Sequence, residues 1–143
     1  MIYFDSSALV KRYIEEAGSK EVNKLLRVST KAVTSRLAYP EMLSAIMRRH
    51  RAGDIATSDC ERIKREFRIE WGGFTIIEIH SELFNIIDKI IEKHTLCGAD
   101  CIHLSTALWL QQVTKQDVLF AASDAELLKA AQAEKLKTCN PQE

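Results

Sequence analysis

The 143-residue chain has few of the residues that interrupt or cross-link a fold: two prolines, five glycines and four cysteines, none of them in a CxxC pair. With so little proline and glycine, long linkers and disordered segments are not expected. No apolar run approaches the roughly 18 residues of a membrane-spanning helix, and no basic start followed by an apolar stretch suggests a secretory signal. We therefore expect a single domain over residues 1–143, located in the cytoplasm and not in a membrane.

The chain also lacks a net charge, since 20 basic residues balance 20 acidic ones. This balance argues against a protein that coats nucleic acid with a generally basic surface. The two halves differ, because residues 1–68 carry 14 Lys and Arg against 9 Asp and Glu, and residues 69–143 carry 6 against 11. The difference fits a basic surface beside an acidic one, or two ordinary solvated faces.

Short apolar runs alternate with amphipathic segments along the whole chain. The runs predict strands at 2–4, 32–35, 74–79, 118–122 and 136–138. Helices are expected between them, the main ones at 37–51, 58–71 (with Ser58 and Glu61 as a capping box), 80–94, 98–113 and 124–134. Strands that alternate with helices indicate an α/β fold, a three-layer α/β/α sandwich with a central, mostly parallel sheet.

Four acidic residues stand where these elements begin or end. Asp5 follows the first strand and Asp124 follows the run 118–122, while Glu41 and Asp100 lie in the first turns of their helices. In open parallel sheets, ligands bind beyond the carboxyl ends of the strands. We therefore expect all four side chains at one edge of the sheet, where they would repel one another unless a proton or a metal ion neutralised them.

Hard oxygen ligands of this kind suit Mg²⁺ or Mn²⁺ and suit zinc poorly. Such an ion lowers the pKa of a bound water and stabilises charge on a leaving oxygen, which is the chemistry of phosphodiester hydrolysis. We therefore predict that Asp5, Glu41, Asp100 and Asp124 are metal ligands and catalytic residues. Each acid alone would equally serve as a helix cap or a favourable charge at a helix N-terminus.

Cysteine and histidine offer an alternative site near the third acid. Cys97 and Cys101 are four residues apart, with Asp100 and His103 beside them, so a soft-metal site is conceivable. Cys101 and His103 would point in different directions on a helix, which favours buried thiols instead. His103 could carry a proton, but a packed imidazole is the interpretation we favour.

Four stretches of the chain resemble one family in order and spacing: Tyr3 to Lys11, Ser35 to Glu41, Ala99 to Leu108 and Ser123 to Leu128. They resemble the PIN domains, and among these the VapC-type ribonuclease toxins of toxin–antitoxin pairs. The resemblance implies a PIN-like fold and an endoribonuclease dependent on Mg²⁺ or Mn²⁺ that cuts structured RNA. It also implies a small antitoxin as partner and a homodimer.

Within that resemblance, Asp5, Glu41 and Asp100 match the three core acids of the family, and Asp124 matches the fourth, more variable one. Ser7 matches a hydroxyl two residues after the first acid, which would steady that carboxylate or a metal-bound water.

The chain departs from the family pattern at two positions. Ala122 stands where Ser or Thr is common, so that the hydroxyl has moved to Ser123, and Cys97 stands where a basic residue is common. Both departures leave the core acids in place. They put in question how strongly the fourth acid binds a metal and which residues contact the RNA.

Anionic RNA needs basic groups around an acidic pocket. Lys11, Arg12 and Arg36 are the candidates, since each lies near one of the acids in sequence. The run from Arg48 to Arg51 is a further candidate, although basic residues at the end of a helix also complement its dipole.

The sequence is compatible with more than one partner surface and more than one function. Phe67, Trp71 and the Leu25–Leu26 pair would form a groove for an antitoxin helix, or belong to the core. Trp109 and Leu110 would serve a dimer interface or stay buried. One rival function is a phosphatase with Asp5 as nucleophile, although Ser7 stands where such enzymes carry a second Asp. The other is a catalytically silent module that binds RNA or protein.

Overall fold

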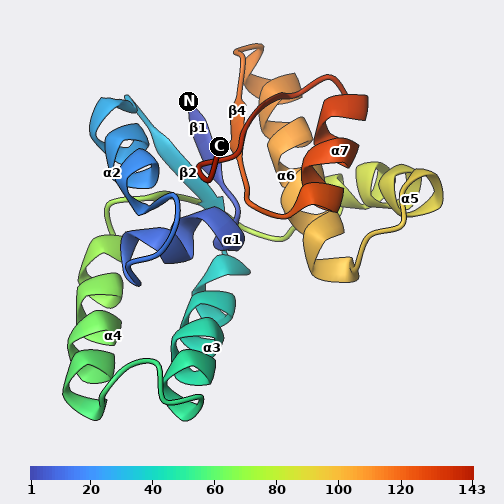
Figure 1. Cartoon of the computed structure of the whole chain (residues 1–143). Helices are drawn as coiled ribbons and strands as arrows, with labels where there is room; N and C mark the ends of the chain where they lie inside the picture. Colours follow the sequence, from blue (N-terminus) through green and yellow to red (C-terminus); the bar gives the residue numbers. More distant parts are fainter.

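Five short parallel strands form the centre of the computed structural model, which describes residues 1–143 (Figure 1). In chain order the strands are β1 (Ile2–Phe4), β2 (Ala32–Ser35), β3 (Thr75–Ile77), β4 (Leu119–Ala121) and β5 (Lys137–Cys139). They lie side by side in the order β3-β2-β1-β4-β5, and every neighbouring pair is parallel. The expected α/β fold with a parallel sheet is confirmed.

Helices connect the strands and cover both faces of the sheet. They are α1 (Ser6–Leu9) with the 3₁₀ turn η1 (Val10–Arg12), α2 (Ser19–Val28), α3 (Ala38–Arg51), α4 (Thr57–Trp71), the 3₁₀ turn η2 (Ser81–Leu83), α5 (Phe84–Lys93), α6 (Gly98–Thr114) and α7 (Ala125–Ala133). In Figure 1, α5, α6 and α7 lie on one side of the strands, and α1 and α2 on the other, with the α3–α4 hairpin extending below them. None of the helices combines the length and the apolar character needed to cross a bilayer.

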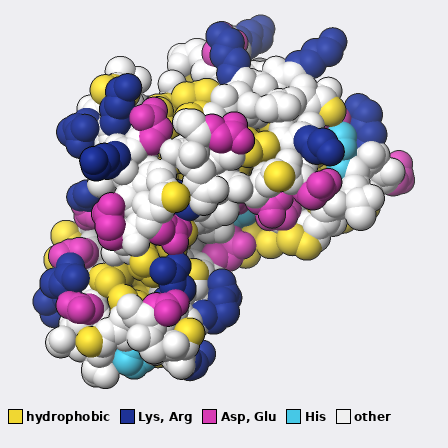
Figure 2. All heavy atoms as spheres, in the orientation of Figure 1, with side chains coloured by type: hydrophobic (Ala, Val, Ile, Leu, Met, Phe, Trp, Pro, Cys, Tyr) yellow, Lys and Arg dark blue, Asp and Glu magenta, His cyan; other side chains and the backbone are white.

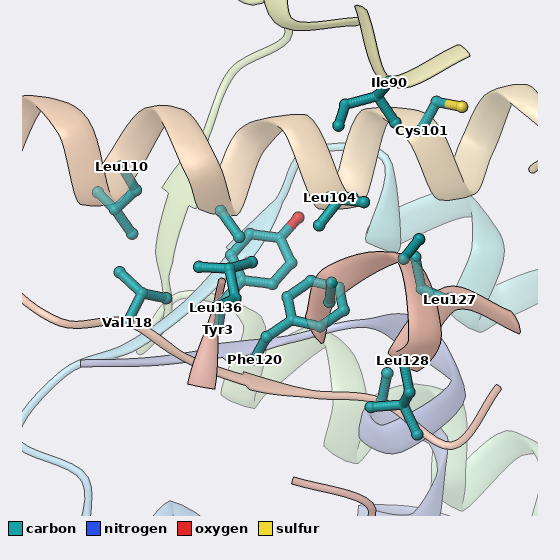
Figure 3. Packing of buried hydrophobic residues seen from close by; sticks show 14 of the residues in the cluster. Tyr3, Ile90, Cys101, Leu104, Leu110, Val118, Phe120, Leu127, Leu128 and Leu136 are labelled. Carbon is teal, nitrogen blue, oxygen red and sulfur yellow. The ribbon is translucent and has the colours of Figure 1, made fainter. Parts of the chain in front are cut away.

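Alternating side chains of the central strand divide the core into two clusters. Ile2 and Phe4 of β1 belong to a cluster with buried residues of α1 to α4, whereas Tyr3 belongs to one with α5, α6 and α7. This alternation is the two-residue period of a strand that is buried on both faces. Figure 3 shows the second cluster, in which the rings of Tyr3 and Phe120 stack with centroids 5.5 Å apart.

The order of the strands reverses at β1. The chain adds β2 and β3 on one side of β1 and then places β4 on the other side, with Phe4 in register with Ala121. The loops that leave β1 and β4 therefore diverge at the carboxyl edge of the sheet, which is where open α/β sheets bind their ligands.

Candidate active site

An open pocket of about 510 Å³ lies at this edge of the sheet. All four acids predicted from the sequence line it, together with Ser6, Ser7, Val10, Leu37, Pro40, Ser44, Ala45 and Arg48. Residues far apart in sequence thus meet at the switch point, as the positions of the four acids at the ends of elements had suggested. In Figure 2, acidic and basic side chains both occur where the α3–α4 hairpin joins the rest of the molecule.

Asp5 lies deepest of the four, with 2% of its surface exposed. It is the N-cap of α1, and its Oδ2 accepts hydrogen bonds from the backbone N–H of Ser7 at 3.0 Å and from the Ser7 hydroxyl at 2.5 Å. Its other oxygen, Oδ1, is buried and has no hydrogen-bond partner. A buried carboxylate oxygen without a donor is costly, so this atom is suited to bind a positively charged ligand.

Ser7 joins the first acid to the loop of the fourth. While its hydroxyl donates to Asp5, the same oxygen accepts the backbone N–H of Ser123 at 2.9 Å. The hydroxyl of Ser123 itself is buried without a partner, so in this structure Ser123 supports the site through its backbone. Ala122 is fully buried in the core cluster of α6 and α7, where a hydroxyl would need a partner of its own.

Asp100 and Asp124 complete the acidic side of the pocket. Burial, followed by the negative charge of Asp5, raises the pKa of Asp100, and the charge of Asp124 adds to this shift. Carboxylates placed this close repel one another unless a proton or a metal ion neutralises them. Asp124 is exposed and caps α7, because its Oδ1 accepts the backbone N–H of Leu127 at 2.9 Å.

Glu41 is held by a histidine that sequence reasoning assigned to packing. Nε2 of His103 lies 2.6 Å from Oε1 of Glu41 and 3.7 Å from Oδ1 of Asp5, and Nδ1 lies 2.8 Å from the hydroxyl of Tyr3. The hydroxyl of Ser6 also donates to Glu41, at 3.1 Å. His103 is indeed fully buried, but it is buried against the acids. The signal in the sequence was its spacing, since a residue three positions after Asp100 shares a helix face with it.

The charge of His103 follows from these neighbours. Burial alone lowers the pKa of an imidazole, yet the hydrogen bond to Glu41 and the negative charge of Asp5 outweigh it and raise the pKa of His103. In its imidazolium form the ring donates through Nε2 to Glu41 and through Nδ1 to the oxygen of Tyr3. The raised pKa favours the charged form of the ring beside Glu41 and Asp5.

The structure contains no ready-made group of three or more His, Cys, Asp or Glu side chains placed to hold one metal ion. The oxygens of the acids accept hydrogen bonds instead, from Ser7, His103 and the backbone of Leu127. The alternative site at the cysteines is not formed either, because Cys97 is exposed whereas Cys101 is buried in the core.

The basic residues predicted to surround the pocket lie elsewhere. Lys11 is buried and bonded to Glu16 at 2.9 Å, Arg12 is bonded to Glu70 at 2.8 Å, and Arg36 is bonded to Glu78. None of the three lines the acidic pocket, where Arg48 is the only basic residue. Lys11, Arg12 and Arg36 stay predictions as RNA contacts, although the ammonium group of Lys11 is buried and already paired with the carboxylate of Glu16.

Sequence comparison decides the family. The profile of the PIN domain matches residues 2–136. The chain belongs to the PIN-domain family. This PIN domain is 32% identical over 108 residues to Ribonuclease VapC45 of Mycobacterium tuberculosis, an alignment that covers 76% of the chain and 75% of that relative. The resemblance found in the four sequence stretches is thereby confirmed.

Solved structures support the PIN-like fold over the full length of the chain. FitAcB from Neisseria gonorrhoeae superimposes with a TM-score of 0.71 at 15% identity, covering 99% of this chain and 98% of that one. A toxin–antitoxin complex from Klebsiella pneumoniae gives a TM-score of 0.66 at 15% identity, with coverage of 99% and 98%. At such low identity these likenesses concern the fold.

Replacing His103 by Ala is expected to lower the free energy of unfolding by about 1–3 kcal/mol, because the buried hydroxyl of Tyr3 loses its partner and Glu41 loses its donor. Urea denaturation measures the loss. Tyr3→Phe removes the other partner of the Tyr3–His103 hydrogen bond. The double variant should therefore lose less free energy of unfolding than the two single variants together. Strictly additive losses would show that the two side chains do not interact.

Proposed function

We propose that the protein is a divalent-metal-dependent endoribonuclease and the toxin of a toxin–antitoxin pair. One observation carries the proposal: the side chains of Asp5, Glu41, Asp100 and Asp124 line a single pocket at the switch point of the sheet. Membership of the PIN-domain family and the similarity to Ribonuclease VapC45 support the same activity and substrate class.

The donor set suits Mg²⁺ or Mn²⁺. All four acids offer hard oxygens, and the partnerless Oδ1 of Asp5 is a buried acceptor available to a cation. Asp5 and Asp100 would hold the ion, with Glu41 and Asp124 contributing from the two sides of the pocket. When bound, the ion supplies a water of lowered pKa and stabilises charge on the leaving oxygen.

The remaining residues orient and balance these acids. Ser7 fixes the Asp5 carboxylate by donating twice to Oδ2, which keeps Oδ1 directed away from the helix cap. His103 holds Glu41 and offsets part of the negative charge while the pocket is free of metal. Ser6 and His103 both contact Oε1 of Glu41, so its other oxygen, Oε2, would be the one available to a shared ion. The open shape of the pocket admits a phosphodiester strand.

A second pocket, of about 550 Å³, is the proposed antitoxin site, as expected for a chain whose structural relatives include a toxin–antitoxin complex. It lies between α2 and α4 and includes Leu26, Ile69 and Phe74 beside Arg12 and Arg27. Phe67 and Leu25, which the sequence suggested for this groove, are buried in the core instead. Trp71 faces a separate shallow pocket with Tyr39 and Ile79.

A homodimer remains part of the proposal. Leu110 is buried in the core, so it does not contribute an interface, and the Trp109 indole N–H donates to Glu82 at 2.9 Å. The exposed apolar side chains on this side of the molecule belong to α5 and α6, namely Phe84, Ile91 and Val113. They offer the apolar contact that Trp109 and Leu110 were expected to provide.

The activity is tested with total RNA. We expect cleavage in the presence of Mn²⁺ or Mg²⁺, loss of cleavage in EDTA, and recovery when excess metal is restored, because carboxylates alone do not activate water for this reaction. Gel electrophoresis of the products measures all three. The rival binding module predicts RNA binding that is insensitive to chelator and no cleavage at any Mn²⁺ concentration. A phosphatase would instead form a covalent phosphoaspartate at Asp5, which mass spectrometry detects.

A further inference from the structure

Arg48 differs from the other basic residues near the carboxyl edge of the sheet. Its side chain lines the acidic pocket, yet it forms no ion pair with any carboxylate. Its one side-chain hydrogen bond goes to the hydroxyl of Ser44 at 3.0 Å, one turn earlier on α3. A guanidinium group beside four acids that remains unpaired is free to bind an anion that enters the pocket.

Neighbouring basic residues are already engaged. Arg49, the next residue in the sequence, is bonded to Glu16 and Asp54, and Nδ1 of His50 contacts the carbonyl of Ile55 at 2.9 Å. The basic run at the end of α3 is therefore not one uniform patch. Only Arg48 faces the site, while Arg51 is exposed at the end of the helix, outside the pocket.

The pocket-lining residues of α3 form one face of the helix. Glu41, Ser44, Ala45 and Arg48 follow the spacing of three and four residues that places side chains in a row. Arg48 lies seven positions after Glu41, which corresponds to about 10 Å along the helix axis. A strand whose scissile phosphate lies at the acids therefore places a neighbouring phosphate near Arg48.

We propose that Arg48 binds a backbone phosphate of the RNA next to the scissile one, and so guides the strand along this face of α3. The inference rests on the proposed nuclease function. Ser44 holds the guanidinium over the pocket, and the small side chain of Ala45 leaves the path between the acids and Arg48 open. Figure 2 shows basic side chains, with acidic ones among them, on the α3–α4 hairpin.

The test compares Arg48→Gln with Arg51→Gln, a matched control on the same helix whose side chain is exposed and lies outside the pocket. Binding of a fluorescent single-stranded oligoribonucleotide is measured by anisotropy in EDTA, where the RNA stays intact. Arg48→Gln should weaken binding about tenfold, as expected for one charged hydrogen bond. It should also reduce the slope of log Kd against log salt by about 0.7, the value for one phosphate of a single strand. Arg51→Gln should change neither quantity by a comparable amount, and Arg48→Lys should recover part of the affinity.

Cleavage of total RNA with Mn²⁺ separates this proposal from the function on which it rests. Arg48→Gln should raise KM and leave the rate at saturating RNA unchanged, because the contact is not made with the reacting phosphate. If the parent cleaves RNA but Arg48→Gln matches it in Kd and salt slope, the assignment of Arg48 is overturned and the nuclease function stands. If the parent fails to cleave while the two binding curves differ as described, the nuclease function falls and the phosphate contact remains.

Discussion

Replacing Asp5 by Asn should abolish cleavage of RNA, by about 10²–10³-fold or more, without unfolding the chain. The substitution removes the negative charge from the most buried acid of the pocket, including the Oδ1 atom that accepts no hydrogen bond. Asn caps a helix about as well as Asp and its side-chain oxygen accepts the same N–H of Ser7, so α1 should keep its start. Gel assays of total RNA with Mn²⁺ measure the loss, and circular dichroism shows whether the fold is retained.

Asp88→Asn is the matched control, since Asp88 is exposed on α5 and forms no ion pair. A thermal melt gives a second readout that does not depend on cleavage. Mn²⁺ at a hundred times its Kd should stabilise the parent by about 2.7 kcal/mol. The same Mn²⁺ concentration should stabilise the Asp5→Asn variant much less. In metal-free buffer the variant should melt at or above the temperature of the parent, because a source of repulsion is gone. Turnover of Asp5→Asn equal to that of the parent would rule out the proposed role of this acid.

The meeting of the four acids followed from local signals and one rule of topology. Asp5 and Asp124 directly follow apolar strands, and Glu41 and Asp100 lie in first helical turns, so each could be assigned to an element end from its neighbours alone. Parallel strands place their carboxyl ends at one edge, and this brings the acids to one pocket without knowledge of the strand order. Their second role as helix caps is also present in the structure, for Asp5 and Asp124.

Contacts between distant polar residues were not predictable in the same way. His103 and Glu41 are 62 positions apart, and their hydrogen bond depends on how α6 and α3, which pack in the two different core clusters, are positioned relative to one another. Likewise, 20 acidic residues offer many partners for each basic one, so the sequence does not indicate that Arg36 meets Glu78 or that Arg48 meets none. The packing of helices and strands determines which of these residues meet. As a result Arg48, and not Arg36, is the better candidate for RNA binding.

The exact residue at which a helix begins was also not predictable from the sequence. The sequence suggests Ser58 as a cap, but α4 starts at Thr57, and its N-cap, Ala56, makes no side-chain hydrogen bond. Cys60, Ile63 and Phe67 are buried on the inner face of α4, and this burial determines where the helix lies. Each such side chain contributes about 1.5–3 kcal/mol, more than the roughly 1 kcal/mol of a capping residue.

Truncation of Phe120 to Ala should lower the free energy of unfolding by about 3–5 kcal/mol. Phe120 lies in the middle of β4, is fully buried, and stacks on Tyr3 of the neighbouring strand with an interplanar angle of 13°. Its removal leaves a cavity between the sheet and α6 and α7, which Figure 3 shows filled by this ring and its neighbours. Urea denaturation followed by circular dichroism measures the loss.

Val28→Ala is the control, because this side chain is 65% exposed and its truncation should change stability by no more than about 0.5 kcal/mol. Phe120→Leu keeps most of the volume and should cost clearly less than Phe120→Ala. At temperatures where Phe120→Leu is fully folded, its RNA cleavage should equal that of the parent, since the acids lie at the edge of the sheet and Phe120 does not line their pocket. A folded Phe120→Leu variant without cleavage would mean that the stacking of Tyr3 on Phe120 itself sets the position of Asp5, and that core and site are not separable in this chain.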